Sequence, residues 1–183
     1  MKFPLRSITV MAMLLAFYVV LRLFGTIYIT PQFRIGFTFI PIAVTAFLYG
    51  PWAALIFGFL SDILGYISRP TGPYFPGFAI SEMVHGLIYA FFLYKRPVDS
   101  LIWLIIRVAI ARVLIAVVVL FGLNYIWFSF FGHLIGAPAN LREPFVFFIA
   151  TGRLLSNLLL LPTYIFFSVV FVRLADKLHK RIY

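Results

Sequence analysis

Two aromatic side chains, Tyr74 and Phe75, lie in a nine-residue stretch that is rich in proline and glycine. The stretch reads PTGPYFPGF, from Pro70 to Phe78, and separates two apolar segments. Prolines and glycines at this density interrupt a helix, and prolines also reduce the conformational entropy that a loop loses when a ligand docks. We therefore predict a preformed clamp in which Tyr74, Phe75 and Pro76 hold a flat molecule. The alternative is a well-packed connection between two helices.

Glu82 and His85 offer a second kind of chemistry, because they are three residues apart and share one face of a helix. The Glu82 carboxylate could accept paired N–H donors of a heterocycle, or it could simply be an acid near a helix start beside a satisfied histidine. Asn157, one turn after Arg153, could likewise recognise a ring edge or hydrogen-bond a neighbouring helix.

Several further ionisable side chains fall inside apolar segments, where they usually face a partner or a cavity. They are Arg22, Asp62, Arg107, Arg112 and Arg153. Guanidinium groups hold carboxylates in a bidentate manner, so the arginines are candidate contacts for an anionic ligand, with Arg22 the first candidate. The alternative is contact with lipid phosphate. Asp62 is expected to neutralise one of the buried arginines, and a role in proton relay is the alternative.

Composition predicts the elements that position these side chains. Of the 183 residues, 64% are hydrophobic and 11% are charged, and the mean hydropathy is +1.09. Such values are typical of an all-α integral membrane protein with one membrane domain over residues 1–183. We predict a compact bundle of six transmembrane helices, at about residues 7–25, 36–50, 51–67, 78–95, 101–125 and 144–173. Residues 124–144 are expected to form a longer loop.

The distribution of lysine and arginine predicts the orientation, because cytoplasmic loops carry these residues in excess. On one side lie Lys2, Arg6, Lys95, Arg96, Arg173, Lys177, Lys180 and Arg181, and on the other Arg34, Arg69 and Arg142. Both termini are therefore predicted to be cytoplasmic. Arg107 is expected nearer the cytoplasmic end of its span than the other candidates. The net charge of +10 is scattered around apolar spans, which argues against a nucleic-acid partner.

Motifs for catalysis are absent from the sequence. It contains no GxxxxGK[ST], HExxH or GxSxG pattern, no cluster of acids suited to a metal, and no cysteine. We predict that the chain is not an enzyme and needs neither a metal nor a cofactor. A membrane enzyme acting on lipid head groups is the remaining alternative from that class.

Ala12 and Ala16 form an AxxxA pattern in the first apolar segment. Small side chains at this spacing let another helix approach closely. The pattern predicts either packing within the chain or docking on a partner membrane protein.

The stretch from Arg34 to Tyr89 resembles the substrate-binding S components of energy-coupling factor (ECF) vitamin transporters, and among them the folate-specific group. The matching features are Gly50–Pro51, the G-xxx-D-xx-G of Gly58, Asp62 and Gly65, and the PTGPYFPGF stretch. Ala54 departs from the pattern, in which glycine is frequent, and this difference should affect local packing more than ligand choice.

The resemblance implies a six-helix bundle in the plasma membrane of a prokaryote. It implies folate binding at the outward face, under the loops that follow spans 1, 3 and 5. It also implies association with a transmembrane coupling subunit and two cytoplasmic ATPases, partly through Ala12 and Ala16. An S component for another flat nutrient, such as a pyrimidine, riboflavin or a queuosine precursor, is the alternative within the class.

Overall fold

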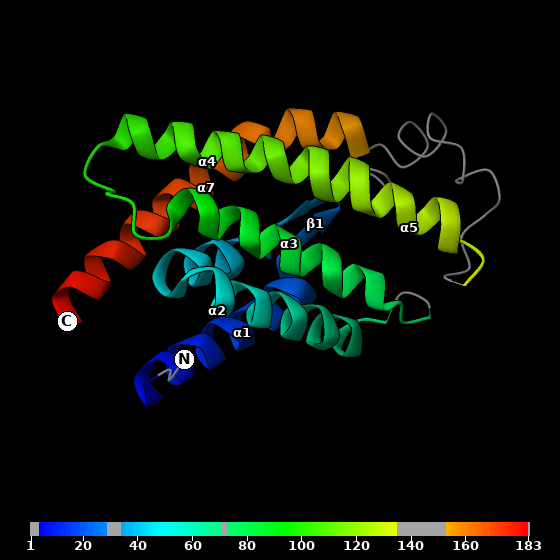
Figure 1. Ribbon diagram of the computed structural model, residues 1–183, viewed down its shortest axis with the longest axis horizontal. Helices are drawn as coiled ribbons and strands as arrows, with labels where there is room; N and C mark the ends of the chain where they lie inside the picture. Colours follow the sequence, from blue (N-terminus) through cyan, green and yellow to red (C-terminus); the bar gives the residue numbers. More distant parts are fainter. Residues whose placement is uncertain (1–3, 29–33, 71–72, 135–152, 183) are drawn as a thin grey trace.

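The computed structural model describes residues 4–28, 34–70, 73–134 and 153–182, and these residues are predominantly helical (Figure 1). The helices are α1 (Leu5–Phe24), α2 (Phe39–Ser68), α3 (Pro76–Leu93), α4 (Leu101–Ile115), the π-helix η1 (Ala116–Leu123), α5 (Asn124–Phe131) and α7 (Arg153–Ile182). Within the described residues, five helical stretches are long and apolar enough to cross a membrane. A helical membrane protein was predicted, and this part of the prediction is confirmed.

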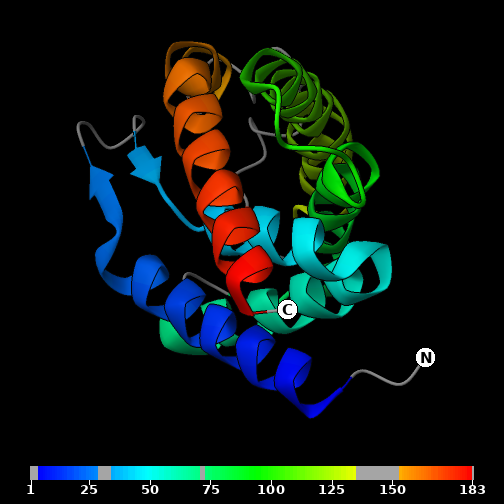
Figure 2. The ribbon, with the colours of Figure 1, turned by 90° about the vertical axis from the view of Figure 1, so that its left-hand side faces the viewer.

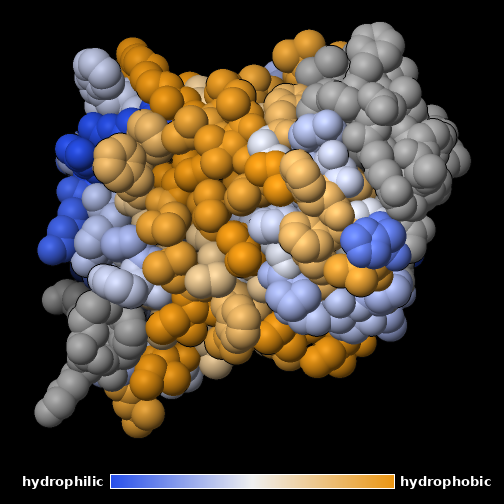
Figure 3. All heavy atoms as spheres, turned by 45° about the vertical axis from the view of Figure 1, so that its right-hand side comes forward, coloured by the Kyte–Doolittle hydropathy of each residue, from blue (hydrophilic) through white to orange (hydrophobic). Residues whose placement is uncertain are grey.

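The surface agrees with this assignment. Figure 3 shows apolar side chains over the middle of one face, with hydrophilic side chains toward its edges. Large apolar residues are widely exposed, including Phe24 at 81% and Phe91 at 75%. A helix satisfies its own backbone hydrogen bonds and can therefore lie in lipid. Apolar side chains can face the hydrocarbon because they carry no polar group that needs a hydrogen-bond partner.

Two short strands depart from the all-helical prediction. β1 (Thr26–Tyr28) and β2 (Arg34–Gly36) pair in antiparallel fashion, with Ile27 opposite Ile35. Figure 2 shows this hairpin continuing from the end of α1. The predicted second span, residues 36–50, therefore begins later, at Phe39, because Gly36 still belongs to the hairpin.

The predicted break at Gly50 and Pro51 is present as a kink inside α2. Gly50 has φ 81° and ψ −168°, so the helical hydrogen bonding of residues 39–49 does not continue smoothly into residues 51–68. A Cβ at Gly50 would lie 2.8 Å from the ring of Tyr94. Both the positive φ and the close ring require glycine at this position.

The predicted fifth span, residues 101–125, is too short. α4, η1 and α5 follow one another without interruption from Leu101 to Phe131, so the first residues of the predicted loop 124–144 are helical. Residues 124–131 carry aromatic side chains that pack on α3, and this packing supports a helix there. The last helix, α7, runs to Ile182, nine residues beyond the predicted end; residues 144–152 lie outside the described residues.

Helices α2 and α3 pack closely and form much of the core. At Gly58 an added Cβ would lie 2.6 Å from the carbonyl oxygen of Glu82, so only glycine allows the two backbones to approach this closely. The contact fixes the position of Glu82 relative to α2. α3 begins at Pro76, which occupies the first helical turn, where the missing N–H of proline costs no hydrogen bond. The clamp stretch therefore ends at Phe75, and Pro76 belongs to the helix.

Candidate functional site

Glu82 and His85 lie on one face of α3, as their spacing predicted. Nδ1 of His85 is 3.4 Å from Oε2 of Glu82, an electrostatic contact whose angles do not make a hydrogen bond. The His85 ring stacks on Tyr89, with ring centroids 5.4 Å apart. The Glu82 side chain keeps 29% of its surface exposed, although its Oε2 atom is buried.

Arg112 connects four helices around this pair. It is only 8% exposed, and its Nη1 donates a hydrogen bond of 3.2 Å to the Tyr89 hydroxyl. That hydroxyl lies 3.3 Å from Oγ of Ser168 in α7. The Arg112 guanidinium also lies 4.9 Å and 4.1 Å from the ring centroids of Phe39 and Tyr164, respectively. The rings and hydroxyls hold a positive charge in the interior of the bundle.

Arg22 and Asp62 complete a charged cluster with Glu82. Arg22 lies in the last turn of α1, and its Nε would be 3.6 Å from a Cβ at Gly65 of α2. Arg22 interacts electrostatically with both Asp62 and Glu82, and Arg112 interacts with Glu82. No arginine lies within 4.0 Å of either carboxylate in the described part of the chain, so the expected close ion pair of Asp62 is not formed there.

Four buried atoms of this cluster have no hydrogen-bond partner among the described residues. They are Oδ2 of Asp62, Oε2 of Glu82, Nε2 of His85 and Nε of Arg112. Buried polar atoms are nearly always hydrogen-bonded, so each one requires an explanation. Two carboxylate acceptors, one guanidinium donor and an imidazole nitrogen form a suitable set for a polar ligand that carries both N–H groups and negative charge.

The two rings of the predicted clamp point to different neighbours. Tyr74 lies toward α2, with its ring 5.0 Å from that of Tyr66 and its hydroxyl hydrogen-bonded to Asp62. Desolvation and the nearby Asp62 carboxylate raise the pKa of Tyr74, so the hydroxyl stays protonated and can donate at neutral pH. Phe75 lies toward α5, 5.6 Å from Trp127 and 5.3 Å from Phe131 between ring centroids. The rings thus flank the start of α3 and do not form a facing pair.

Trp127 anchors α5 to the start of α3. Its Nε1 donates a hydrogen bond of 3.0 Å to Oγ of Ser81, which is next to Glu82 in the sequence, and Ser81 Oγ lies 3.3 Å from Oδ1 of Asn124. Trp127 was expected in the loop of residues 124–144, so this contact was not predicted. Tyr89, Ser168 and His85 were also absent from the predicted site residues; the i, i+4 spacing of His85 and Tyr89 was the available signal.

The structure separates Arg107 from the cluster. Its Nη1 donates a hydrogen bond of 2.9 Å to the carbonyl oxygen of Pro97, in the connection before α4. Glu82 lies near the opposite end of α3, so the structure does not bring Arg107 together with this cluster. Asn157 is half-buried near the start of α7, and Arg153 begins that helix, but the Arg153 side chain lies outside the described part of the structure.

Ala12 and Ala16 are both exposed on α1. Buried side chains of α1 are instead Ser7 and Tyr18, and Tyr18 packs edge-on against Phe57 of α2. The alternative that the two alanines serve packing within this chain is therefore not supported by their exposure. The pair is available to a second molecule.

Arg112 makes the site sensitive to substitution. We expect Arg112→Met to lower the free energy of unfolding by roughly 1–3 kcal/mol, because it removes a hydrogen bond and two cation–π contacts. Thermal unfolding of the purified protein in detergent measures this loss. Arg107→Met, on the same helix but away from the cluster, is the matched control. Equal stability of the two variants would show that the Arg112 contacts add nothing to the fold.

The described residues thus form an apolar helical bundle, suited to a membrane, that contains a cluster of opposite charges. Comparison with known proteins identifies its family. The family model for the ECF transporter, substrate-specific component, matches residues 6–176. The chain belongs to this family.

Two curated relatives, each called folate transporter FolT, are similar to the chain. The FolT of Clostridium novyi (strain NT) is 40% identical over 116 residues, which cover 62% of this chain and 64% of that protein. The FolT of Leuconostoc mesenteroides is 29% identical over 161 residues, which cover 88% of this chain and 81% of that protein. The match to the first relative thus spans less than two thirds of its length.

Solved structures agree in fold. A crystal structure of FolT bound with folic acid matches 93% of this chain and 94% of that one, with a TM-score of 0.73 and 27% identity. The S component of a bacterial ECF transporter matches 97% and 95% of the two chains, with a TM-score of 0.52 and 21% identity, which shows similarity of fold alone.

Proposed function

We propose that this chain is the folate-binding S component of an ECF-type importer. The observation that carries the proposal is its similarity over nearly the whole chain to a FolT that was crystallised with folic acid. Membership of a substrate-specific transporter family also weighs against the alternative of a membrane enzyme acting on lipid head groups.

The chemistry of the charged cluster supports folate as the ligand. Folate has a planar pterin whose edge carries N–H donors, and an anionic glutamate tail. We assign the carboxylates of Glu82 and Asp62 to the N–H donors, because their unpartnered oxygens are acceptors. Arg22 and Arg112 are assigned to the tail, because guanidinium groups bind carboxylates strongly. Arg153 and Asn157 remain candidates from the start of α7.

The aromatic residues at the start of α3 are assigned to the rim of this site. Tyr74 is 39% exposed and tied to Asp62, so its free ring surface is available next to a carboxylate. Phe75 is packed among its own neighbours and supports the rim from the α5 side. Pro76 fixes where α3 begins and therefore where Glu82 lies, nearly two turns later.

The membrane arrangement that goes with this function has six spans and cytoplasmic termini. The kink at Gly50 supports counting residues 39–49 and 51–68 as separate segments, although the first is only about 16 Å long at 1.5 Å per residue. The N- and C-termini lie toward the same end in Figure 1, as an even number of spans requires. The lysine and arginine count assigns that end to the cytoplasm of a prokaryotic cell.

Titration of the purified protein with folate tests the proposed ligand. We expect saturable binding of folate in detergent, without partner subunits or ATP, followed by tryptophan fluorescence with correction for ligand absorbance. Riboflavin, thiamine and a hydroxymethylpyrimidine are the comparison ligands. Saturation by one of these and not by folate would keep the transporter class and replace the substrate; saturation by none would contradict the proposal.

Trp127 is expected to report this binding, because it contacts Phe75 and Ser81 beside Glu82. Trp127→Phe should remove most of the ligand-dependent fluorescence change. Trp103→Phe is the matched control, since Trp103 is 60% exposed on α4 and has no contact with the cluster in the described structure. A change that survives in Trp127→Phe and disappears in Trp103→Phe would move the site away from the start of α3.

A further inference from the structure

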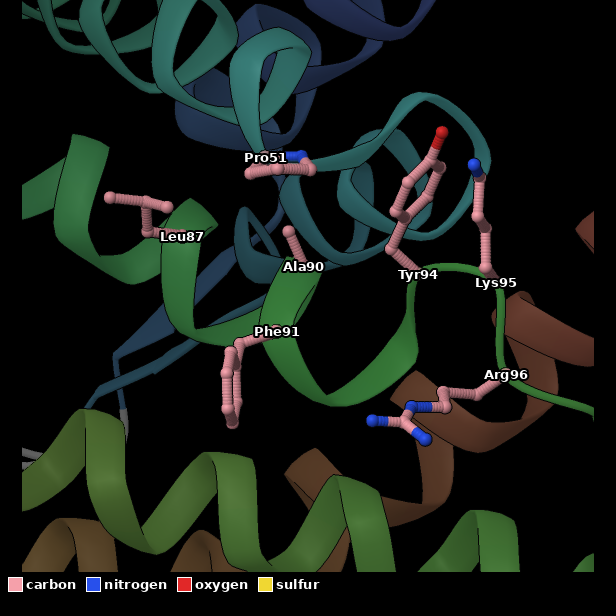
Figure 4. Close-up of a pocket in the computed structure, with 7 residues that line it drawn as sticks. All are labelled: Pro51, Leu87, Ala90, Phe91, Tyr94, Lys95 and Arg96. Atoms are coloured by element: carbon pink, nitrogen blue, oxygen red, sulfur yellow. The ribbon is translucent and has the colours of Figure 1, made fainter.

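A pocket lies at the opposite end of α3 from Glu82. Its volume is about 420 Å³, and it opens where α2 bends and α3 ends. The lining residues are Pro51, Leu87, Ala90, Phe91, Tyr94, Lys95 and Arg96 (Figure 4). Since Glu82 precedes Leu87 by more than one turn and none of the cluster residues lines this pocket, it is separate from the proposed folate site.

Two residues beside this pocket, Gly50 and Lys95, have a positive φ angle. The Tyr94 ring lies against Gly50 at the kink of α2, and the next residue, Lys95, has a positive φ of 54°. Such a φ is uncommon for a residue with a side chain, so the turn after α3 is held by its surroundings. Nζ of Lys95 lies 5.3 Å from the centroid of the Tyr94 ring. In Figure 4, Lys95 and Tyr94 extend side by side toward α2, while Arg96 extends to the other side of the pocket.

The charged side chains that line the pocket are positive. Neither Lys95 nor Arg96 has a carboxylate within 4.0 Å in the described part of the chain. The nearby acid, Asp99, lies 3.6 Å from Lys180 instead, and Asp176 lies 2.9 Å from the same lysine. The pocket therefore presents two available cations on either side of an apolar floor.

The apolar part of the pocket is continuous with the lipid-facing surface. Phe91 is 75% exposed, and Leu87 lies one turn before it on the same face of α3. Trp52, which follows Pro51, is 61% exposed. A small free anion would contact the cations and leave these apolar side chains bare. An anion with a hydrocarbon chain would contact both.

We propose that this pocket binds one anionic phospholipid. Its phosphate lies between Lys95 and Arg96, and an acyl chain lies along Leu87 and Phe91. Basic pockets between helix ends at a membrane surface favour such head groups, and long cationic side chains reach the phosphate level readily. The bound lipid would fill the angle between the kink of α2 and the end of α3.

Lipid binding to the whole purified protein tests this proposal. We expect native mass spectrometry to detect one phosphatidylglycerol bound in preference to phosphatidylcholine. The double variant Lys95→Ala, Arg96→Ala should bind phosphatidylglycerol roughly 25-fold more weakly, because each cation near the membrane surface contributes about fivefold. Lys177→Ala, an exposed lysine of α7 outside the pocket, is the matched control and should keep the preference.

Three results would overturn the proposal. They are equal binding of the two lipids, an equal loss in Lys177→Ala, and competition by inorganic phosphate at the concentration of the lipid. The last result would identify a free-anion site. Folate titration of the double variant is a separate readout of folding, since the pocket shares no residue with the folate site. Retained folate binding with lost lipid preference is the expected combination.

Discussion

Replacing Ala12 and Ala16 together with tryptophan is expected to abolish vitamin uptake while leaving ligand binding unchanged. Both alanines are exposed on α1, and neither contributes to the buried face that carries Ser7 and Tyr18. Small side chains permit close approach of a second helix, and two indole rings would hold that helix several ångströms away. The measurement is folate uptake by cells that produce the variant with the coupling subunit and the ATPases, together with folate titration of the purified variant.

Two controls separate docking from general damage to α1. Phe17→Trp places an indole on a different exposed face of the same helix and should preserve uptake. Ala12→Gly with Ala16→Gly keeps the surface small and should also preserve it. If the tryptophan variant loses ligand binding but still assembles with the coupling module, the alanines serve packing and the docking assignment is wrong.

Replacing Glu82 with glutamine is expected to weaken folate binding by about 10- to 150-fold, the equivalent of roughly 1.5–3 kcal/mol for hydrogen bonds to a charged group. Glutamine keeps the shape of the side chain but substitutes an N–H donor for one acceptor oxygen. It also removes the negative charge that faces His85, Arg22 and Arg112. Fluorescence titration of the purified variant measures the change.

The matched control is Asp99→Asn, which removes an exposed carboxylate far from the cluster. It should bind folate as the unaltered protein does. An affinity of Glu82→Gln equal to that of the control would exclude Glu82 from the binding site. Thermal unfolding of both variants is the accompanying check, because loss of a buried charge can also alter the stability of its neighbours.

The sequence alone determined the class of the protein and the positions at which its helices are interrupted. Long apolar segments require helices in lipid, because a helix satisfies its own backbone hydrogen bonds. Gly50–Pro51 and Pro76 act locally, through a positive φ and a missing N–H, so the kink and the start of α3 were predictable within a few residues. The AxxxA pattern is equally local. Its exposure, however, depends on which neighbours surround α1.

Tertiary structure decided which candidates meet. Arg107 and Arg112 are five residues apart on one helix, and both were candidate ligand contacts. In the structure, Arg107 donates a hydrogen bond to the carbonyl oxygen of Pro97, and Arg112 donates one to the hydroxyl of Tyr89. The Tyr89–Ser168 contact joins residues 79 positions apart, and no periodicity in the sequence signals it. Such pairings depend on how each helix is rotated about its axis and packed on its neighbours. Because an apolar helix exposes a similar surface to lipid at many rotations, the sequence does not indicate which rotation occurs.

The same reason explains the arrangement of the rings at the start of α3. Tyr74 and Phe75 are adjacent in sequence, so they suggested one clamp, but an extended backbone directs successive side chains to opposite sides. The Tyr74 side chain lies beside Asp62 and Tyr66 of α2. The Phe75 ring lies beside Trp127 and Phe131 of α5. Residue types therefore predicted which functional groups the site contains. The packing of α2, α3 and α5 determined the position of each of these groups.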